Sequence, residues 1–321
     1  MLLSRLPATH SMRAGSSNCD DRRVTTTSAG SAWDSASFDA FERRGWAARA
    51  GAYRDGFAQL TAHTVAPLLA AAGVGPGAAV LDVGTGPGTV AAAAAAMGAS
   101  VTAVDASPDM ARLAAERCPP VRVVVAVLPA LPFADSSFDA VVGNFVINHL
   151  GDPTAGLAEL LRVLRPGGRL ALSCWNRHGM RATGVFGEAV AAARIPFPAD
   201  LPNGGPFLAD HDDRSNAFAA LLASAGVADA TTRRVEWLHR VHPDAWWTSV
   251  VTGTPLTGSL IARLDPAAAA AVKDRYDAAV AEYAVPGTDL VALPAVAVLG
   301  SGRRVPTDSQ RWFVDSGSGL K

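Results

Sequence analysis

A glycine-rich loop follows an apolar stretch in the segment VLDVGTGPG, at residues 80–88. Its glycines are spaced as G-x-G-x-G, at Gly84, Gly86 and Gly88. Glycine adopts positive φ angles and has no Cβ, so such a loop lets the backbone approach a ligand closely. The helix expected after it offers free N–H groups and a partial positive charge to an anionic group. The loop therefore indicates a nucleotide-like ligand, and the alternative is a packing turn without a ligand.

Two ligand classes use such a loop, a pyrophosphate dinucleotide such as NAD and a sulfonium nucleoside. The dinucleotide fingerprint is G-x-G-x-x-G, but Thr89 stands where its third glycine should fall. Asp82, two residues before the loop, would repel a pyrophosphate, whereas it suits an ammonium or sulfonium group. Asp105 follows the loop at the distance typical of an acid that binds a ribose diol. Together these acids favour a nucleoside with an amino-acid tail, whose ammonium group is expected near Asp82 and the Asn144 backbone.

An alternation of apolar strands with helices must position these residues. We predict strands at 79–83, 100–105, 121–127, 138–146 and 169–175, and helices at 88–97, 108–117 and 154–164. Strands that are apolar on both faces and separated by helices form a parallel sheet that is covered on both sides. Beyond them we expect a helix at 216–227 and strands at 231–238 and 290–299, and the N-terminal helices are expected to break at Gly56.

The chain is expected to divide into five segments. They are a flexible arm (1–32), N-terminal helices that form a cap (33–73), a core that binds the cofactor (74–242), a helical lid insertion (243–287), and the last strand with a tail (288–321). The beginning lacks the continuous apolar region of a signal peptide, and no apolar run approaches the roughly 20 residues of a membrane span. We therefore expect a cytoplasmic protein without a membrane partner.

Composition narrows the class of protein further. The 321 residues are 49% hydrophobic, enough for a sizeable core, and the net charge of -1 gives no sign of a nucleic-acid partner. Cys19, Cys118 and Cys174 are widely spaced and fit neither a disulfide framework nor a zinc site, so no metal is expected. We expect an enzyme that is a monomer or a homodimer and takes a small-molecule acceptor.

Four motifs occur in the order and spacing of one family: VLDVGTGPG, VTAVDASPDM, LPALPFADSSFDAVVGNFVINHL and LLRVLRPGGRLALSCW. Over about residues 53–175 the chain resembles class I S-adenosylmethionine-dependent methyltransferases, especially the type-11 group of quinone-biosynthesis and small-molecule tailoring enzymes. The resemblance implies an α/β fold, a doubly wound, seven-stranded Rossmann-like sheet of order 3-2-1-4-5-7-6 with the last strand antiparallel. It implies S-adenosyl-L-methionine as cofactor, bound by Asp82, Gly84, Thr85, Gly86, Gly88, Asp105, Ala106, Met110, Val127, Leu128, Asn144 and His149.

One position departs from the family pattern. The family usually carries an Asp before the LPF segment, where it binds the adenine amino group, and Val127 occupies that position in this sequence. Adenine recognition is therefore expected from backbone groups near Leu128, or from Asp135 or Ser136.

Two residues are candidates for the chemistry of methyl transfer. A sulfonium donor is already activated, so the protein contributes mostly position and the exclusion of water. His149 follows the fourth predicted strand and is a candidate base for an oxygen nucleophile, and shaping the pocket is the alternative. Tyr53 precedes the glycine loop and is the second candidate, in contact with the cofactor carboxylate or the acceptor, with simple packing as the alternative.

The acceptor is expected to be small and fairly hydrophobic. Its predicted contacts are Tyr53, Phe57, Trp175, Trp246 and Trp247, although at least one of the paired tryptophans is as readily a core residue. Two other functions remain open at this point. One is a fold relative that binds the same cofactor but catalyses a cyclisation or a decarboxylation, and the other is an NAD-dependent oxidoreductase.

Overall fold

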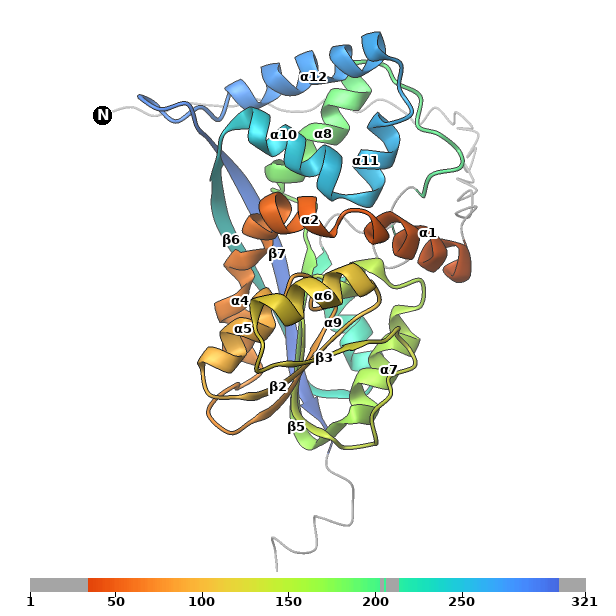
Figure 1. Cartoon of the computed structure of the whole chain (residues 1–321), viewed down its shortest axis with the longest axis vertical. Coiled ribbons are helices and arrows are strands. Elements are labelled where there is room, and N and C mark those ends of the chain that lie inside the picture. Colours follow the sequence, from red (N-terminus) through yellow and green to blue (C-terminus); the bar gives the residue numbers. More distant parts are fainter. Residues whose placement is uncertain (1–33, 203–204, 206–213, 306–321) are drawn as a thin grey trace, which may run out of the picture. The chain divides into compact units, whose positions relative to one another are not determined.

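The computed structural model describes residues 34–202, 205 and 214–305. A seven-stranded sheet of order β3-β2-β1-β4-β5-β7-β6 forms its centre (Figure 1). The strands are β1 (Ala79–Val83), β2 (Ser100–Asp105), β3 (Arg122–Val125), β4 (Phe138–Gly143), β5 (Leu164–Trp175), β6 (Val227–Val241) and β7 (Val291–Arg304). Strands β1 to β5 pair in parallel, and β7 runs antiparallel to both β5 and β6. The predicted strand order and the antiparallel last strand are confirmed.

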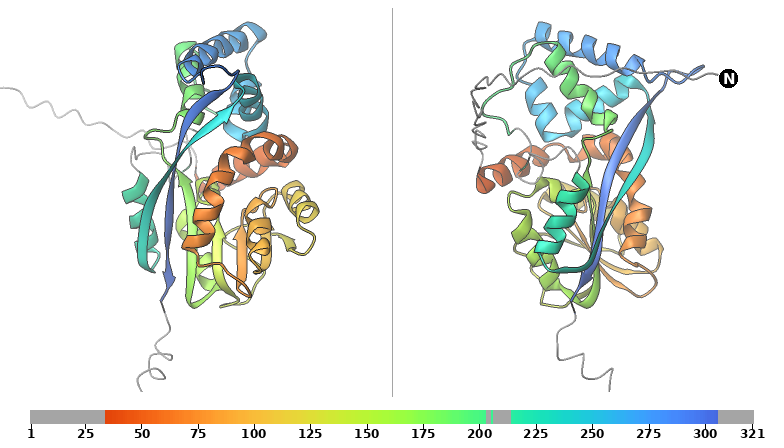
Figure 2. Two further views of the ribbon diagram at one scale, coloured as in Figure 1. Left: turned by 90° about the vertical axis from the view of Figure 1, so that its left-hand side faces the viewer. Right: turned by 180° about the vertical axis from the view of Figure 1, so that it is seen from behind.

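Helices cover both faces of the sheet, as near-continuous apolar strands require. On one face, α4 (Val65–Ala71) and α5 (Thr89–Ala96) pack in a buried cluster that includes Val80 of β1. On the other face, α7 (Pro153–Val163) and α9 (Arg214–Ser224) pack in a second cluster with Leu81 of β1. The side view on the left of Figure 2 shows α4 in orange and α9 in teal on opposite sides of the sheet. Helix α6 (Pro108–Arg117) packs against β2 and β3.

A layer of helices lies beyond the carboxyl ends of the parallel strands. It contains α1 (Ser35–Ala47), α8 (Arg181–Ala192), α10 (Pro243–Gly253), α11 (Pro255–Ile261) and α12 (Pro266–Ala281). Strands β6 and β7 reach this layer as a two-stranded ribbon, because β5 ends at Trp175 opposite Ala297 and the earlier part of β7 pairs with β6 alone. The ribbon and the helices share one buried cluster that contains Phe186, Trp246, Tyr276 and Leu293. From here on, the cap means α1, α8, α10, α11 and α12 together; of the N-terminal segment 33–73 it includes only α1.

A short helical chain connects α1 to α4. It consists of α2 (Ala50–Ala52), a π-helical turn (Tyr53–Phe57), α3 (Ala58–Thr61) and a 3₁₀ turn (Ala62–Thr64). The break predicted at Gly56 is wrong, since this residue lies inside the π-helical turn. A Cβ on Gly56 would stand 2.2 Å from Oγ of Ser249 on α10, so close packing of the cap requires the glycine.

Two further differences from the sequence-based prediction affect the site. The strand predicted at 138–146 ends at Gly143, after which the backbone turns and a 3₁₀ turn runs from Val146 to His149. Helix α8 was not predicted at all, and it packs closely with α12 in the cap. None of the helices in the described ranges is both long and apolar enough to cross a membrane.

Candidate active site

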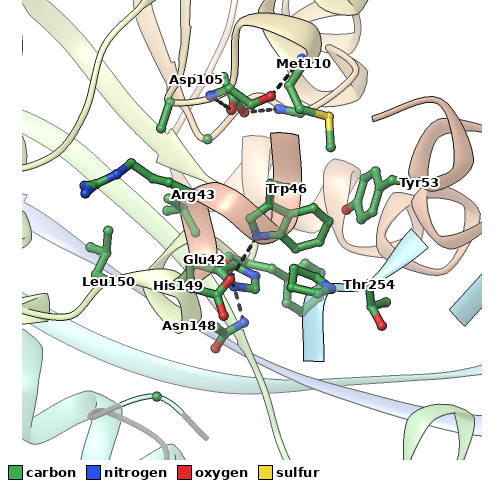
Figure 3. Close-up of a pocket in the computed structure, with 18 of the residues that line it drawn as sticks. Glu42, Arg43, Trp46, Tyr53, Asp105, Met110, Asn148, His149, Leu150 and Thr254 are labelled. Atoms are coloured by element: carbon green, nitrogen blue, oxygen red, sulfur yellow. Dashed lines mark hydrogen bonds and ion pairs between the residues drawn. The ribbon is translucent and has the colours of Figure 1, made fainter. Parts of the chain in front are cut away.

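A cavity of about 400 Å³ opens where the parallel strands end (Figure 3). The sheet contributes residues at or just after the carboxyl ends of β1 to β5, and the cap contributes α1 and the junction of α10 with α11. Ligands of open α/β sheets bind at this carboxyl edge. Its lining includes Asp39, Glu42, Arg43, Trp46, Tyr53, Phe57, Gly84, Gly86, Asp105, Ala106, Met110, Val127, Leu128, Asn144, Phe145, His149, Trp175, Thr254, Pro255 and Leu256.

The glycine loop forms one wall of this cavity. Gly86 has a φ of +55°, and the nearest atom to a Cβ placed there would be Cε1 of Tyr53, at 3.8 Å. The loop is therefore open toward the cavity at this residue, which suits a ligand that approaches the backbone. Gly88 has a φ of +80°, and its Cβ would stand 2.9 Å from Cα of Ala114, so this glycine allows α5 and α6 to pack closely. Gly88 itself is not among the lining residues.

Asp105 presents a fixed carboxylate at the edge of the cavity. Its Oδ2 accepts a hydrogen bond from the Gly86 N–H and its Oδ1 accepts one from the Ser107 N–H, both at 2.8 Å. Burial raises the pKa of the Asp105 carboxyl above its ordinary value, and these two donors oppose that effect. The side chain thus joins the glycine loop to the end of β2, and its remaining lone pairs suit the hydroxyls of a ribose.

Asp82 lies beneath the loop and does not line the cavity. It is fully buried, and its Oδ2 accepts a hydrogen bond of 2.6 Å from Oγ1 of Thr85. Its Oδ1 has no hydrogen-bond partner within the described residues, and burial raises the pKa of the carboxyl to about 7. The structure therefore places Asp82 and Thr85 as supports of the loop and does not bring them to the cavity wall.

The ionisation of Asp82 is expected to change the stability of the protein with pH. Because its pKa of about 7 in the folded state lies above the value near 4 expected for an unfolded chain, the native protein holds a proton that the unfolded chain releases. This contribution to stability is complete below about pH 4 and is lost as the pH rises through about 7. Asp82→Asn cannot ionise, so its melting temperature should fall less between these pH values than that of the wild type.

Thermal unfolding at a series of pH values measures this difference. Asp109→Asn is the matched control, since Asp109 is exposed in the first turn of α6. If the melting temperatures of the wild type and of Asp82→Asn fall equally across this pH range, the prediction is contradicted.

His149 pairs with a carboxylate that sequence reasoning missed. Its Nδ1 lies 2.8 Å from Oε2 of Glu42, and Nε1 of Trp46 donates to the same oxygen at 2.9 Å (Figure 3). The Trp46 ring meets the rings of His149 and Tyr53 edge-on, with centroid distances of 5.3 Å in each pair. Glu42 and Trp46 are one helical turn apart on α1, but no local pattern connects them to a histidine 107 residues away.

Tyr53 and Asn144 occupy the positions expected of them in the cavity, but their polar atoms are engaged. The Tyr53 hydroxyl lies 3.3 Å from Oγ1 of Thr61, and burial raises its pKa to about 12, so the phenol stays protonated at neutral pH. The Asn144 side chain donates to the Thr61 carbonyl and accepts from Thr64 and Ser173. Tyr53 is therefore no base at neutral pH, and the Asn144 side chain connects the segment before α4 to the sheet.

Phe145 is a second lining residue that sequence reasoning missed. It has a φ of +63°, which is uncommon for a residue other than glycine, and its ring stacks on Trp175 with centroids 3.8 Å apart. Trp175 also lies edge-on to Phe57, and all three rings line the cavity. The predicted contacts Phe57 and Trp175 are thus brought together, and Phe145 completes an aromatic wall.

The paired tryptophans lie elsewhere. Trp246 is 1% exposed, its Nε1 donates to the Ala182 carbonyl at 2.7 Å, and its ring stacks on Phe57. Trp247 stacks on Phe186 within the cap. Neither tryptophan is among the lining residues of the cavity. Trp246 is buried in the cap and Trp247 is partly buried there, so the structure does not bring them to the cavity wall. Thr254, Pro255 and Leu256 form the cap side of the cavity instead.

The position at which the family usually carries an adenine-binding Asp, occupied by Val127 in this chain, lies on the wall of the cavity. Val127 is 38% exposed and lines the cavity together with Leu128. The two alternative partners of adenine are engaged away from it: Asp135 pairs with Arg162 at 2.6 Å, and Oγ of Ser136 accepts a hydrogen bond from Arg304 at 3.2 Å. Neither Asp135 nor Ser136 is a lining residue, so the structure does not bring either of them to the cavity.

Known proteins resemble this chain in sequence and in fold. A family model described as a methyltransferase domain matches residues 81–172. A demethylmenaquinone methyltransferase of Mycobacterium sp. (strain KMS) is 46% identical over 197 residues, which are 60% of this chain and 77% of that protein. One of Tropheryma whipplei is 32% identical over 181 residues, 52% of this chain and 75% of that protein.

Other matches are shorter or more distant. An uncharacterized protein of Mycobacterium tuberculosis is 36% identical over 157 residues, 46% of this chain and 56% of that protein, so the chain spans about half of its length. Among solved structures, the YcgJ protein of Bacillus subtilis has a TM-score of 0.49 at 19% identity, over 76% of this chain and 99% of that one. From the family model and the mycobacterial and Tropheryma relatives, the chain belongs to the class I S-adenosylmethionine-dependent methyltransferase family.

Proposed function

We propose that this protein transfers a methyl group from S-adenosylmethionine to a small, fairly hydrophobic acceptor bound in the cavity. The observation that carries the proposal is that one continuous cavity joins the Gly84–Gly86 loop and Asp105 to a wall of aromatic rings. The glycine loop and Asp105 suit a nucleoside with an amino-acid tail, and the wall of aromatic rings suits a flat apolar compound. The relatives named demethylmenaquinone methyltransferase support an acceptor of the quinone or secondary-metabolite type.

The residues of the cavity fit this cofactor. The backbone at Gly86, which is open toward the cavity, would hold the carboxylate end, and Asp105 would accept hydrogen bonds from the ribose hydroxyls. Met110, which is 4% exposed, would pack on the adenine together with Leu128. When bound, S-adenosylmethionine supplies a methyl group that is already activated by its sulfonium.

The protein then contributes position and a site from which water is excluded. The aromatic wall orients an acceptor, and α1 with the junction of α10 and α11 closes the far side of the cavity. We propose that these parts of the cap act as the lid of the site.

Transfer of isotope-labelled methyl groups tests the function directly. The purified protein is incubated with methyl-labelled S-adenosylmethionine and a panel of hydroquinones, naphthols, catechols and matched aromatic amines, and the products are identified by mass spectrometry. We expect label in a small aromatic product. A cofactor that binds without losing its methyl group to any acceptor, while the protein cyclises or decarboxylates a compound, would support a different reaction on the same fold.

Val127→Asp is expected to strengthen cofactor binding. The substitution places a carboxylate where the family usually has one, at a lining position, and a hydrogen bond to the adenine amino group contributes about 1 kcal/mol, or roughly a fivefold lower dissociation constant. Calorimetric titration with S-adenosylhomocysteine measures the change. Val125→Asp is the control, because Val125 is 53% exposed on β3 and is not a lining residue. Equal or weaker binding by Val127→Asp would show that adenine does not lie at this position.

A further inference from the structure

We propose that Glu42 and His149 form a pair that removes a proton from an aromatic hydroxyl, so that the acceptor is a phenol-class compound methylated on oxygen. The proposal rests on the proposed methyl transfer and names its substrate class. In the pair, His149 is the base, and Glu42 is a positioning residue that acts through it.

The geometry of the pair determines which nitrogen is free. An ionised carboxylate only accepts hydrogen bonds, so the contact of 2.8 Å between Oε2 of Glu42 and Nδ1 of His149 requires the ring proton on Nδ1. The neutral imidazole then carries its lone pair on Nε2, the nitrogen left for a ligand. The second donor to Oε2, Nε1 of Trp46, fixes the carboxylate in place. Only 12% of the Glu42 side chain and 35% of the His149 side chain are exposed.

Several charged groups share the cavity with His149. The carboxylates of Asp39 and Glu42 on α1 and of Asp105 at the end of β2 line the same cavity, and Arg43 lies exposed at its rim. Asp39 accepts a hydrogen bond from the Gly151 N–H, and Asp105 accepts two from backbone N–H groups. A carboxylate behind the ring stabilises the imidazolium that forms when Nε2 takes a proton.

The other lining groups do not offer a competing base. Tyr53 stays protonated because burial raises its pKa to about 12, and the carboxylates of Asp39 and Asp105 already accept backbone hydrogen bonds. Among the described residues, His149 is the only histidine that lines the cavity. A paired, oriented histidine opposite an aromatic wall suits a ring that carries a hydroxyl. An aromatic amine has a free lone pair and reacts without losing a proton first.

The step balances without a further reactant. The O–H bond of the acceptor breaks and its proton goes to Nε2 of His149, while the electron pair of the oxygen forms the bond to the methyl carbon. The carbon–sulfur bond breaks with its electron pair on sulfur, which turns the sulfonium into a thioether. His149 then releases the proton to water.

Binding of a coloured phenol tests the pair without turnover. The protein is saturated with S-adenosylhomocysteine and titrated with para-nitrophenol below the pKa of the free phenol, where only the ionised form absorbs visible light. We expect the bound phenol to ionise, since His149 accepts its proton. His149→Gln, which fills similar space without taking a proton, should abolish the ionisation, and Glu42→Gln should reduce it. His63→Gln is the control, because His63 is exposed and is not a lining residue.

The outcomes separate this proposal from the one on which it rests. Failure of the wild type to bind S-adenosylhomocysteine would overturn the proposed function itself. Normal binding of S-adenosylhomocysteine with no binding of the phenol, with the phenol bound in its neutral form, or with equal ionisation in His149→Gln would overturn the base pair alone.

Kinetics with phenols of graded acidity provides the second test. With labelled S-adenosylmethionine, His149→Gln should lower kcat for weakly acidic phenols by about 10²–10⁴, and by much less for strongly acidic phenols that ionise without help. The product should be the methyl ether. If Glu42 and His149 only fasten α1 over the cavity, the loss will be the same for every phenol. That uniform loss, or a methyl group on carbon or nitrogen, would overturn the proposal.

Discussion

Trp246→Ala is expected to lower the free energy of unfolding by about 3–5 kcal/mol, the usual cost of removing a large aromatic ring from a core. The side chain is 1% exposed, and its ring stacks on Phe57 with centroids 5.4 Å apart. Its Nε1 also donates to the Ala182 carbonyl at 2.7 Å, so the substitution leaves a buried acceptor without its partner. Natural domains are stable by only about 5–15 kcal/mol, so this loss is large. Denaturant titration followed by circular dichroism measures it.

Trp247→Ala is the matched control, because it removes the same side chain one residue later. Trp247 is only partly buried and stacks on Phe186 and beneath Lys273 at the outer side of the cap. We expect Trp247→Ala to lower the free energy of unfolding clearly less than Trp246→Ala does. Equal losses for the two variants would contradict the expectation that the deeper burial of Trp246 sets its larger cost. A loss below about 1 kcal/mol for Trp246→Ala would show that the cap is not part of the cooperative core.

The parts of the fold that local sequence determines were predicted well. The bounds of β1, β2 and α6 agree with the prediction, since glycines, a capping Ser107 and Pro108 mark them in the sequence. The end of β4 depends instead on tertiary packing: the stacking of Phe145 on Trp175 accompanies a positive φ that its own side chain does not favour. Helix α8 contains two glycines, which lower the helix propensity of this segment. Its apolar residues nevertheless recur at helical spacing, so the sequence carries a signal for this helix that the prediction missed; they are Ala182, Val185, Phe186, Ala189 and Val190.

The candidate site likewise has a part that local sequence predicts and a part that only the fold brings together. The spacing of Gly84, Gly86 and Asp105 predicted a ligand loop, and the structure joins Asp105 to Gly86 by a hydrogen bond of 2.8 Å. Glu42 lies on a helix far away in sequence, and only the fold brings it to His149. The paired tryptophans were predicted from composition, which does not distinguish a buried ring from one that lines a cavity.

Asp105→Ala is expected to weaken binding of S-adenosylhomocysteine by about 1–3 kcal/mol, or roughly fivefold to 150-fold in dissociation constant. The substitution removes an acceptor for the ribose hydroxyls. It also frees the N–H groups of Gly86 and Ser107, which the carboxylate holds at 2.8 Å, so the glycine loop loses its support. Calorimetric titration of the variant and the wild type measures the difference.

Asp109→Ala is the control for the change of charge. Asp109 lies four residues further along, is exposed in the first turn of α6 and does not line the cavity. The dissociation constant of Asp109→Ala for S-adenosylhomocysteine should stay within about twofold of the wild-type value. A similar weakening in both variants would mean that general electrostatics, and no contact with Asp105, governs binding.

The central claim is that this cavity binds S-adenosylmethionine, and titration of the wild-type protein with two ligands tests it most directly. S-adenosylhomocysteine and NAD share the adenosine part but differ in the group that meets Gly84, Gly86 and the rest of the loop. We predict saturable one-to-one binding of S-adenosylhomocysteine in the calorimeter and no detectable binding of NAD. Saturable binding of NAD, with no response to S-adenosylhomocysteine or S-adenosylmethionine, would contradict the claim.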